Sequence, residues 1–202
     1  MEEKEKEIVL AAIGVFMRLG IKSVSMDDIS RQLGISKKTL YKYVSDKNDL
    51  VGKGVQLMKD AEEQTISGIQ ALNMNAIDEN MEIMKYVTGL LNNLHPSVMF
   101  DLEKYHPEVS RNMIESRHDN IYQCVMANLN KGLKEGLYRK NLNADIIAKI
   151  YIHSTDVILD QTELPIEGIS FSEKFKEYFR YHIRGIASEK GIEYLKEKYS
   201  KS

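Results

Sequence analysis

The chain has 202 residues, of which 43% are hydrophobic and 29% charged, and its formal net charge is −2. This composition is that of a folded globular protein and excludes an intrinsically disordered chain. No apolar run is long enough to span a membrane, and the acidic, polar start is unlike a signal peptide, so we expect a cytoplasmic protein without a membrane partner. The single cysteine, Cys124, excludes an intramolecular disulfide and lies in an apolar stretch, where we expect a buried thiol. Three prolines and few alternating β-branched runs favour an all-α protein.

The first element in chain order is an amphipathic helix over residues 2–19. Its apolar residues recur at helical spacing, and Gly20 ends it. We expect this helix to support the elements that follow by burying one face, made of Ile8, Ala12, Val15, Phe16 and Leu19.

Two short helices joined by a tight turn are predicted in residues 25–50. Ser25 can cap the first helix, and Asp28 completes a pair that resembles a capping box. Gly34 follows the apolar stripe of this helix, where a positive φ is needed, and Ser36 caps the second helix. This order is the helix-turn-helix pattern, in which the second helix enters the major groove of DNA.

The outward residues of the second helix have the chemistry that DNA contacts need. Lysines neutralise phosphates or donate to guanine, Thr39 can donate, accept or touch a thymine methyl group, and Tyr41 can reach a phosphate. Residues 18–53 hold eight basic and four acidic side chains, a net charge of +4, which leaves −6 for the rest of the chain. An ordinary helical hairpin with a solvated lysine face has a similar local pattern, and charge alone does not separate the two interpretations.

Residues 10–50 also resemble the N-terminal domain of the tetracycline-repressor (TetR) family of bacterial regulators. The resemblance rests on four segments, Phe16-Met-Arg-Leu-Gly20, Ser23-Val-Ser-Met-Asp-Asp-Ile29, Leu33-Gly-Ile-Ser-Lys-Lys-Thr-Leu-Tyr-Lys-Tyr43 and Asp46-Lys-Asn-Asp-Leu50. It implies a three-helix DNA-binding domain over residues 1–50 and a helical effector-binding and dimerisation domain over residues 51–202. The DNA-binding residues expected from the motif and its flanks are Ser25, Lys37, Lys38, Thr39, Tyr41, Lys42, Tyr43 and Lys47.

The rest of the chain predicts further helices and no repeat. The breaks between them are an asparagine-rich stretch, the prolines, the Gly136-Leu-Tyr-Arg139 turn and a loop that contains Pro165 and Gly168. The expected helices run from near Asp46 to about Ile69, over Ala76–Leu94, from His95-Pro96 to about Lys104, and from Pro107 to about Glu135. The last three are expected over Asn143–Asp160, Ser172–Ser188 and Gly191–Lys198.

Methionine and aromatic residues are frequent in the middle of the chain. Such residues line adaptable apolar pockets, but at helical spacing they are more often ordinary core. The resemblance implies that this region holds a pocket for a small-molecule effector of unknown identity. The candidate lining residues are Met81, Met84, Tyr86, Met99, Phe100, Met113, Tyr122 and Met126.

No pattern in the sequence indicates a metal site or a catalytic centre. The five histidines lack the spacings typical of zinc ligands, and His153 on an apolar helix face is interpreted as a core or interface residue. Motifs for nucleophilic catalysis, phosphate binding and dinucleotide binding are absent from the sequence. We therefore expect no metal, no cofactor and no catalytic residue.

The last two long helices carry a broad apolar stripe. Part of it is expected to be intrachain core. In the TetR family the equivalent helices pair with their copies in a four-helix dimer interface, and a twofold dimer can read two half-sites. The interface residues that the resemblance implies are Ile150, Tyr151, Val157, Phe175, Tyr178, Phe179, His182 and Ile186.

Together these features predict a homodimeric transcriptional regulator, a repressor that a small-molecule effector releases from a palindromic operator. Three alternatives stay open. The chain could be an activator of the same family, a helical enzyme or small-molecule-binding protein whose N-terminal domain is only structural, or an interaction scaffold that binds acidic partners.

Overall fold

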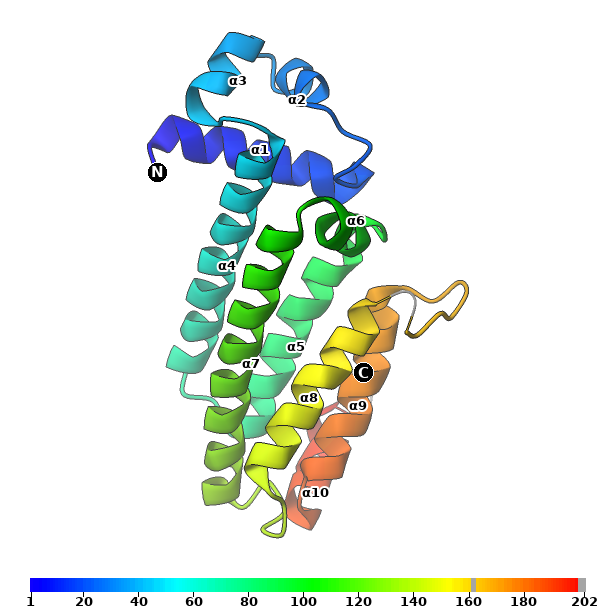
Figure 1. Cartoon of the computed structure of the whole chain (residues 1–202). Coiled ribbons are helices and arrows are strands. Elements are labelled where there is room, and N and C mark those ends of the chain that lie inside the picture. The colour runs from blue at the N-terminus through cyan, green and yellow to red at the C-terminus, as the bar shows by residue number, and fades with distance from the viewer. Residues whose placement is uncertain (161–162, 200–202) are drawn as a thin grey trace. The chain divides into compact units, whose positions relative to one another are not determined.

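The computed structural model describes residues 1–160 and 163–199. Within this part of the chain the regular elements are helices, with one isolated antiparallel bridge between Tyr138 and Ala187, which confirms the all-α prediction (Figure 1). None of the described helices is both long and apolar enough to cross a membrane. The helices are α1 (Glu3–Leu19), α2 (Met26–Gln32), α3 (Lys37–Tyr43), α4 (Lys47–Ala71), α5 (Ala76–Asn92), α6 (Val98–Tyr105), α7 (Pro107–Glu135), α8 (Ala144–Leu159), α9 (Phe171–Ile186) and α10 (Glu189–Tyr199).

The chain forms two compact units. The first consists of Met1–Gln64 and Asn93–Ser116, and the second of Thr65–Asn92 and Arg117–Ser202. The predicted DNA-binding domain, residues 1–50, lies inside the first unit, which also contains α6 and the first turns of α7. Helices α4 and α7 each contribute residues to both units.

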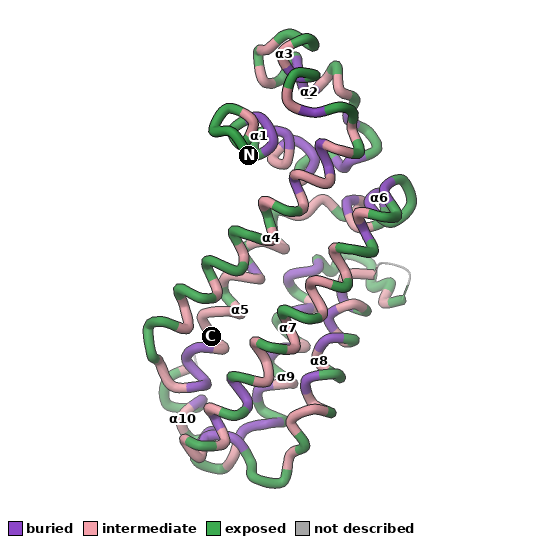
Figure 2. The backbone as a smooth tube through the Cα atoms, turned by 60° about the vertical axis from the view of Figure 1, so that its left-hand side comes forward, coloured by how far each residue is buried: buried purple, intermediate pink, exposed green. Residues whose placement is uncertain are grey.

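The core of the first unit explains why it extends beyond residue 50. Val9 of α1, Ile29 of α2 and Leu40 of α3 are fully buried, and Val98 and Leu102 of α6 belong to the same hydrophobic cluster. Figure 2 colours the backbone of each helix by burial, and α1 and α6 both contain buried stretches. Burying a side chain of this size stabilises the fold by about 1.5–3 kcal/mol, so α6 is an integral part of this core. The sequence pattern of residues 1–50 does not reveal that contribution.

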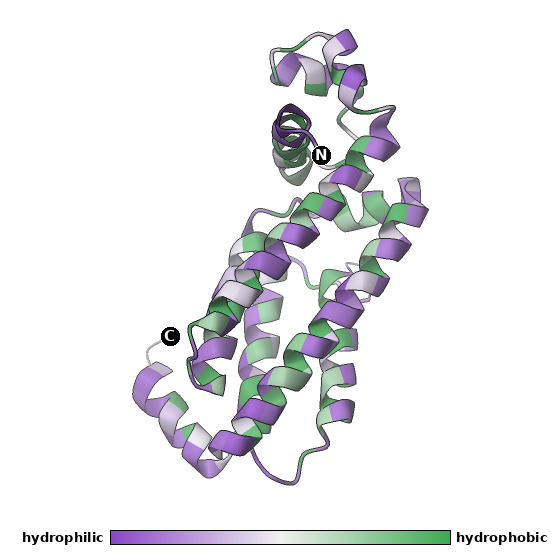
Figure 3. Ribbon diagram, turned by 90° about the vertical axis from the view of Figure 1, so that its left-hand side faces the viewer, coloured by the Kyte–Doolittle hydropathy of each residue, from purple (hydrophilic) through white to green (hydrophobic). Residues whose placement is uncertain are grey.

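The core of the second unit is formed around α5 and α9. Phe179, Ile183 and Ile186 of α9 pack in one cluster with Ile77 and Met81 of α5. The helices of this unit carry hydrophobic and hydrophilic residues in alternation along the ribbon, as amphipathic helices do (Figure 3).

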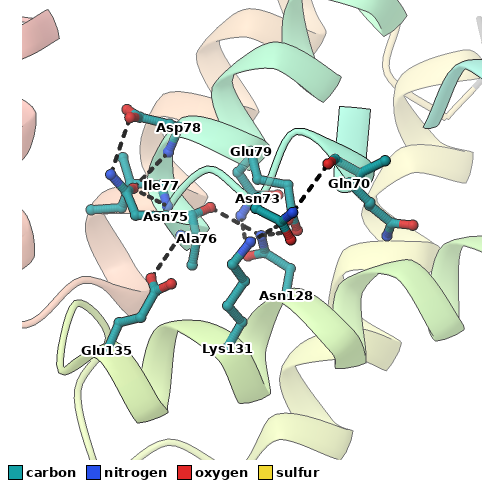
Figure 4. A network of polar contacts seen from close by, with 12 residues as sticks. Gln70, Asn73, Asn75, Ala76, Ile77, Asp78, Glu79, Asn128, Lys131 and Glu135 are labelled. Carbon is teal, nitrogen blue, oxygen red and sulfur yellow. Dashed lines mark hydrogen bonds and ion pairs between the residues drawn. The ribbon is translucent and has the colours of Figure 1, made fainter. Parts of the chain in front are cut away.

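A buried polar network also joins α5 to α7 in the second unit. The Glu79 carboxylate accepts hydrogen bonds from Asn128 Nδ2 at 2.8 Å and from Lys131 Nζ at 2.7 Å (Figure 4). The Tyr138 hydroxyl donates to Asn128 Oδ1 at 2.8 Å, and the Tyr138 ring lies against Gly132, where a Cβ would approach Tyr138 Cδ2 to 2.1 Å. Every polar group of this network has a partner, so its burial does not leave an unsatisfied donor or acceptor.

A second polar network attaches α10 to the start of α5. The carboxylate of Asp78, which is buried, accepts hydrogen bonds from Tyr194 Oη at 2.7 Å, Lys198 Nζ at 2.6 Å and Tyr199 Oη at 2.6 Å. Burial disfavours the charged carboxylate, but these bonds outweigh it and hold the pKa of Asp78 below its usual range.

Most predicted helices match the observed ones to within two or three residues, and three details differ. Leu19 was expected in the buried face of the first helix but is 47% exposed, whereas Val9 is buried in its place. The expected buried thiol of Cys124 is half-buried. Helix α9 begins at Phe171, ahead of the predicted Ser172, because Ser170 and Glu173 form a capping box at its start.

Candidate nucleic-acid interface

The helix-turn-helix of the first unit is shaped by two caps and one glycine. The Ser25 hydroxyl accepts a hydrogen bond from the Asp28 amide, and the Asp28 carboxylate accepts one from the Ser25 amide, which confirms the capping box at α2. Gly34 has a φ of 64°, in the region that favours glycine, and the Ser36 hydroxyl accepts a hydrogen bond from the Thr39 amide at 3.0 Å. These local bonds fix the turn that orients α3.

One face of α3 presents cations and a phenol to solvent. Lys37, Lys38, Tyr41 and Lys42 are exposed, and the exposed fraction of Tyr41 is 48%. Leu40 on the opposite face is fully buried, so the helix cannot rotate without losing its core contact. This arrangement suits a polyanion, because the ammonium groups lie beside a side chain that can stack or donate.

The eight predicted DNA-binding residues are not equivalent in the structure. Lys37 forms an ion pair with Asp27 at 2.6 Å, and the Lys42 ammonium lies 5.3 Å from the centroid of the Tyr43 ring. Ser25 and Thr39 take part in caps, and Thr39 and Tyr43 are half-buried. Lys37, Lys38, Tyr41 and Lys42 are therefore the members of the set on α3 that are exposed, and of these Lys37 is held in an ion pair.

Lys47 differs from the lysines of α3. Its ammonium donates to the Ile21 carbonyl oxygen at 2.6 Å and lies 5.8 Å from the centroid of the Phe16 ring. Burial lowers the pKa of Lys47 from its ordinary value. Lys47 thus connects the start of α4 to the turn after α1, a structural task that its place in the sequence does not reveal.

Within the first unit, polar contacts join α6 and His106, which follows it, to the segments on either side of the helix-turn-helix. The buried Asp101 carboxylate accepts a hydrogen bond from the Lys22 amide at 2.8 Å. His106 Nδ1 lies 2.8 Å from Asn48 Oδ1, and burial lowers the pKa of His106, with the nearby Lys47 charge acting in the same direction. None of these long-range pairs has a local sequence signal, apart from the buried polar residues themselves.

The eight predicted effector-binding residues are divided between the two units. Met99, Phe100 and Met113 belong to the first unit, whereas Met81, Met84, Tyr86, Tyr122 and Met126 belong to the second. Phe100 is 51% exposed, Met81 is part of the second core, and the Tyr122 hydroxyl donates to Asp145 Oδ1 at 2.9 Å. Neither unit by itself brings the full set together.

The predicted dimer residues fall into three groups in the second unit, of which one, Tyr151, Tyr178 and His182, is half-buried. Phe175, Phe179 and Ile186 are 4%, 4% and 2% exposed, so they are intrachain core and offer no area to a partner. Ile150 and Val157 are 53% and 39% exposed. An apolar stripe in the sequence does not distinguish intrachain core from a dimer interface, because both kinds of burial favour the same apolar residue types.

A groove with a volume of about 940 Å³ lies over α8, α9 and the loop between them. Ile150, Val157 and Tyr178 line it, as do residues that the sequence interpretation did not include: Ile146, Leu164, Ile166 and Ile169. Ile146 lies one helical turn before Ile150, so the spacing along α8 was a signal that could have identified it. We name this surface the α8–α9 groove.

Four polar side chains of α7 and α8 form a cluster, and one of them, His153, lines this groove. The Asp156 carboxylate accepts hydrogen bonds from Arg117 and from His118 Nε2, the latter at 2.8 Å, and His153 Nδ1 lies 3.8 Å from it. No group of three His, Cys, Asp or Glu residues in the described part of the chain is arranged to hold a metal ion. The contacts form an ion-pair cluster between two helices.

Comparison with known proteins gives concordant results. Residues 8–53 match the model of the family described as bacterial regulatory proteins, tetR family. The chain is 24% identical over 190 residues to YfiR, an uncharacterized HTH-type transcriptional regulator of Bacillus subtilis (strain 168), covering 86% of this chain and 89% of YfiR.

Solved structures of regulators share the fold. A TetR-family regulator from Agrobacterium tumefaciens superimposes with a TM-score of 0.74 at 18% identity, over 92% of this chain and 98% of its own. A transcriptional regulator from Saccharomonospora viridis in complex with choline gives a TM-score of 0.70 at 18% identity, over 93% of this chain and 100% of its own. At this identity the likeness concerns the fold.

Proposed function

We propose that the chain is a DNA-binding transcriptional regulator of the tetR family and acts as a homodimeric repressor that a small-molecule effector releases from a palindromic operator. The observation that carries the proposal is the exposed face of α3, with Lys38, Tyr41 and Lys42 presented to solvent opposite a buried Leu40. Tyr41 and Lys38 contact bases or adjacent phosphates, and Lys42 contacts mainly phosphates. Lys47 contributes a phosphate contact in addition to its bond to Ile21.

A dimer is supported by the needs of recognition and by the α8–α9 groove. One short helix reads few base pairs, whereas a twofold dimer reads two half-sites about 34–36 Å apart. The exposed Ile150 and Val157, together with Ile166 and Ile169 of the loop, offer an apolar surface that a second copy would cover.

Effector control requires that ligand binding change the affinity of the helix-turn-helix for DNA. We assign the effector to the second unit and operator recognition to the first. Helix α4 contributes residues to both units, and Asp101 and His106 bond to Lys22 and Asn48, on either side of the helix-turn-helix. An effector that binds better to a conformation unfit for the operator shifts the population towards it. We assign the chain no catalytic reaction and expect it to act in the cytoplasm, where its operator lies.

The proposal is tested by selecting bound DNA from a random pool at physiological salt. Wild-type protein should enrich a palindrome with two half-sites. Tyr41→Ala should lose or alter the enriched sequence, because Tyr41 lies on the exposed face and contributes little to the core. Tyr181→Ala, which removes an equally large side chain that is 78% exposed on α9, is the matched control and should enrich the same palindrome as wild type.

Each other outcome counts against a defined part of the proposal. Enrichment of an unrepeated site would refute recognition by a dimer. A Tyr41→Ala protein that enriches the unchanged palindrome would remove Tyr41 from base recognition. If wild-type protein enriches no sequence, the assignment of α3 as a sequence-reading helix is wrong.

A further inference from the structure

An acidic side chain of α2 is paired with the first residue of α3. The Lys37 ammonium lies 2.6 Å from Asp27 Oδ1, and the two side chains are 59% and 50% exposed. Helices α2 and α3 are neighbours in the helix-turn-helix (Figure 1). In this motif the N-terminal residues of the second helix face the base edges of DNA. Asp27 therefore places a negative charge beside the end of α3 that would approach DNA.

The carboxylate of Asp27 is not used to build α2, in contrast to that of the next residue. Asp28 accepts a hydrogen bond from the Ser25 amide at 3.0 Å and completes the capping box. Among the described residues, the Asp27 carboxylate is paired with Lys37. An ion pair this exposed contributes little to stability, although a carboxylate in the first turn also interacts favourably with the helix dipole. The fold alone thus gives a weak reason for Asp27.

The other exposed lysines of α3 are placed differently. Lys38 and Lys42 form no ion pair with a described residue, and the Lys42 ammonium lies 5.3 Å from the centroid of the Tyr43 ring. Both ammonium groups can neutralise phosphates of DNA of any sequence. Lys37, by contrast, is neutralised by Asp27 before DNA arrives.

The ion pair makes a phosphate contact by Lys37 unfavourable. To neutralise a phosphate, Lys37 must leave Asp27, and the carboxylate then stays close to the phosphate. The ammonium and carboxylate are 2.6 Å apart, so a phosphate bound to the same ammonium lies within the Debye length of about 8 Å at physiological ionic strength. Asp27 therefore lowers the affinity for DNA phosphates whatever the base sequence.

A contact from Lys37 to a base does not require the ion pair to break. The ammonium has three donors, of which the bond to Asp27 uses one. The remaining donors are free for acceptors in the major groove such as guanine O6 and N7. The bond to Asp27 also restrains the flexible four-carbon stem of Lys37, which reduces the freedom that the side chain loses on contact.

We propose that Asp27 sets the specificity of DNA recognition as a positioning residue for Lys37. It opposes phosphate contacts that every sequence offers and holds the Lys37 ammonium for a base contact that the operator offers. The inference rests on the proposed function, because it requires an operator that α3 reads.

The test compares Asp27→Asn with wild-type protein on two duplexes of equal length, the selected operator and an unrelated sequence. Fluorescence anisotropy at several salt concentrations gives the dissociation constants. For the unrelated duplex the constant should fall at least threefold, and the salt slope should steepen by about 1, because Lys37 gains a phosphate. The constant for the operator should not fall, so the ratio of the two constants decreases at least threefold.

Two further variants separate positioning from a plain effect of charge. Glu82→Gln removes the same charge from an exposed ion pair with Lys85 in the second unit and should leave both constants unchanged. In a Lys37→Met background, Asp27→Asn should no longer steepen the salt slope, since the cation that it releases is absent. A slope that steepens equally in that background would overturn the proposal, because Asp27 would then act without Lys37.

Three other outcomes would overturn the proposal as well. These are an unchanged salt slope on unrelated DNA, an equal tightening on both duplexes, and a lower free energy of unfolding with an unchanged ratio of dissociation constants, as a purely structural role predicts. The failure of the proposed function has a different signature. If wild-type protein selects no operator, the regulator function is wrong, whereas the salt slope on unrelated DNA still reports whether Asp27 opposes a phosphate contact by Lys37.

Discussion

The surface of α3 in the first unit and the α8–α9 region of the second distribute polarity in opposite ways. Helix α3 turns lysines and Tyr41 towards solvent and buries Leu40. The second unit instead exposes Ile150 and Val157 on α8, while it encloses polar groups such as Glu79 and Asp78. A charged, exposed face suits a hydrated polyanion, whereas an exposed apolar face suits another protein surface.

The difference also explains where sequence interpretation succeeds. In the helix-turn-helix the decisive interactions are local: Ser25 with Asp28, and Ser36 with Thr39. In the second unit the decisive interactions join residues far apart in the chain, such as Glu79 and Asn128. Substitutions in each unit test whether local interactions dominate in the first and long-range interactions in the second.

The largest effect is expected at Gly132, inside the second unit. Gly132→Ala would place a Cβ 2.1 Å from the ring of the buried Tyr138, so the ring must move and its hydrogen bonds must break. We expect a loss of about 3 kcal/mol in the free energy of unfolding, measured by urea denaturation. Gly68→Ala in α4, where a Cβ meets nothing within 4 Å, is the control and should be neutral or stabilising. Equal stability of the two variants would contradict the packing described for Tyr138.

The exposed apolar face of α8 gives the next largest effect. Ile150→Glu places a carboxylate where a second copy is proposed to pack, and the dimer dissociation constant should rise roughly fiftyfold, since the charge would be buried without a partner. Sedimentation velocity over a concentration series measures this constant. Leu72→Glu, at a side chain that is 67% exposed, should leave it unchanged. An unaltered dimer in the first variant would assign the interface to another surface.

A pH-dependent effect is expected at Asp78. Since its pKa in the folded protein is below the unfolded value, its contribution to stability is present above about pH 4 and is lost as the pH falls through the folded pKa. Asp78→Asn should cost about 2 kcal/mol near neutral pH, and the difference from wild type should shrink in acid. Unfolding measured at several pH values checks this. Glu82→Gln, which removes an exposed ion pair with Lys85, should show little change at any pH.

The smallest effects separate two lysines of the first unit. Lys42→Ala should weaken binding to all DNA sequences alike and lower the salt slope of binding by about 1, with little change in stability. Lys47→Ala should also lower the free energy of unfolding by about 1 kcal/mol, because the Ile21 carbonyl loses its donor. Filter binding at several salt concentrations and urea unfolding measure both quantities. Sequence preferences that change with Lys42→Ala would contradict a phosphate contact.

Most of the fold and the course of the helix-turn-helix could be predicted from the sequence, because caps, glycines and helical periodicity are local. The capping box of Ser170 and Glu173 was also a local signal, and its omission moved the predicted start of α9. By contrast, the bond from Lys47 to Ile21 spans 26 residues, and the burial of Phe179 depends on which helix packs against it. Interactions of this kind depend on the tertiary arrangement, which a pattern along one helix does not contain.

The bond between the Lys22 amide and the Asp101 carboxylate, at 2.8 Å, makes that amide a spectroscopic reporter. An amide proton bonded to a carboxylate in a turn should exchange slowly with deuterium only while α6 stays attached. Its exchange rate, followed by NMR during titration with an effector, would show whether the ligand loosens the attachment of α6 to the turn that follows α1. The exchange rate of this amide would therefore report an effect of the ligand on the first unit without a DNA-binding measurement.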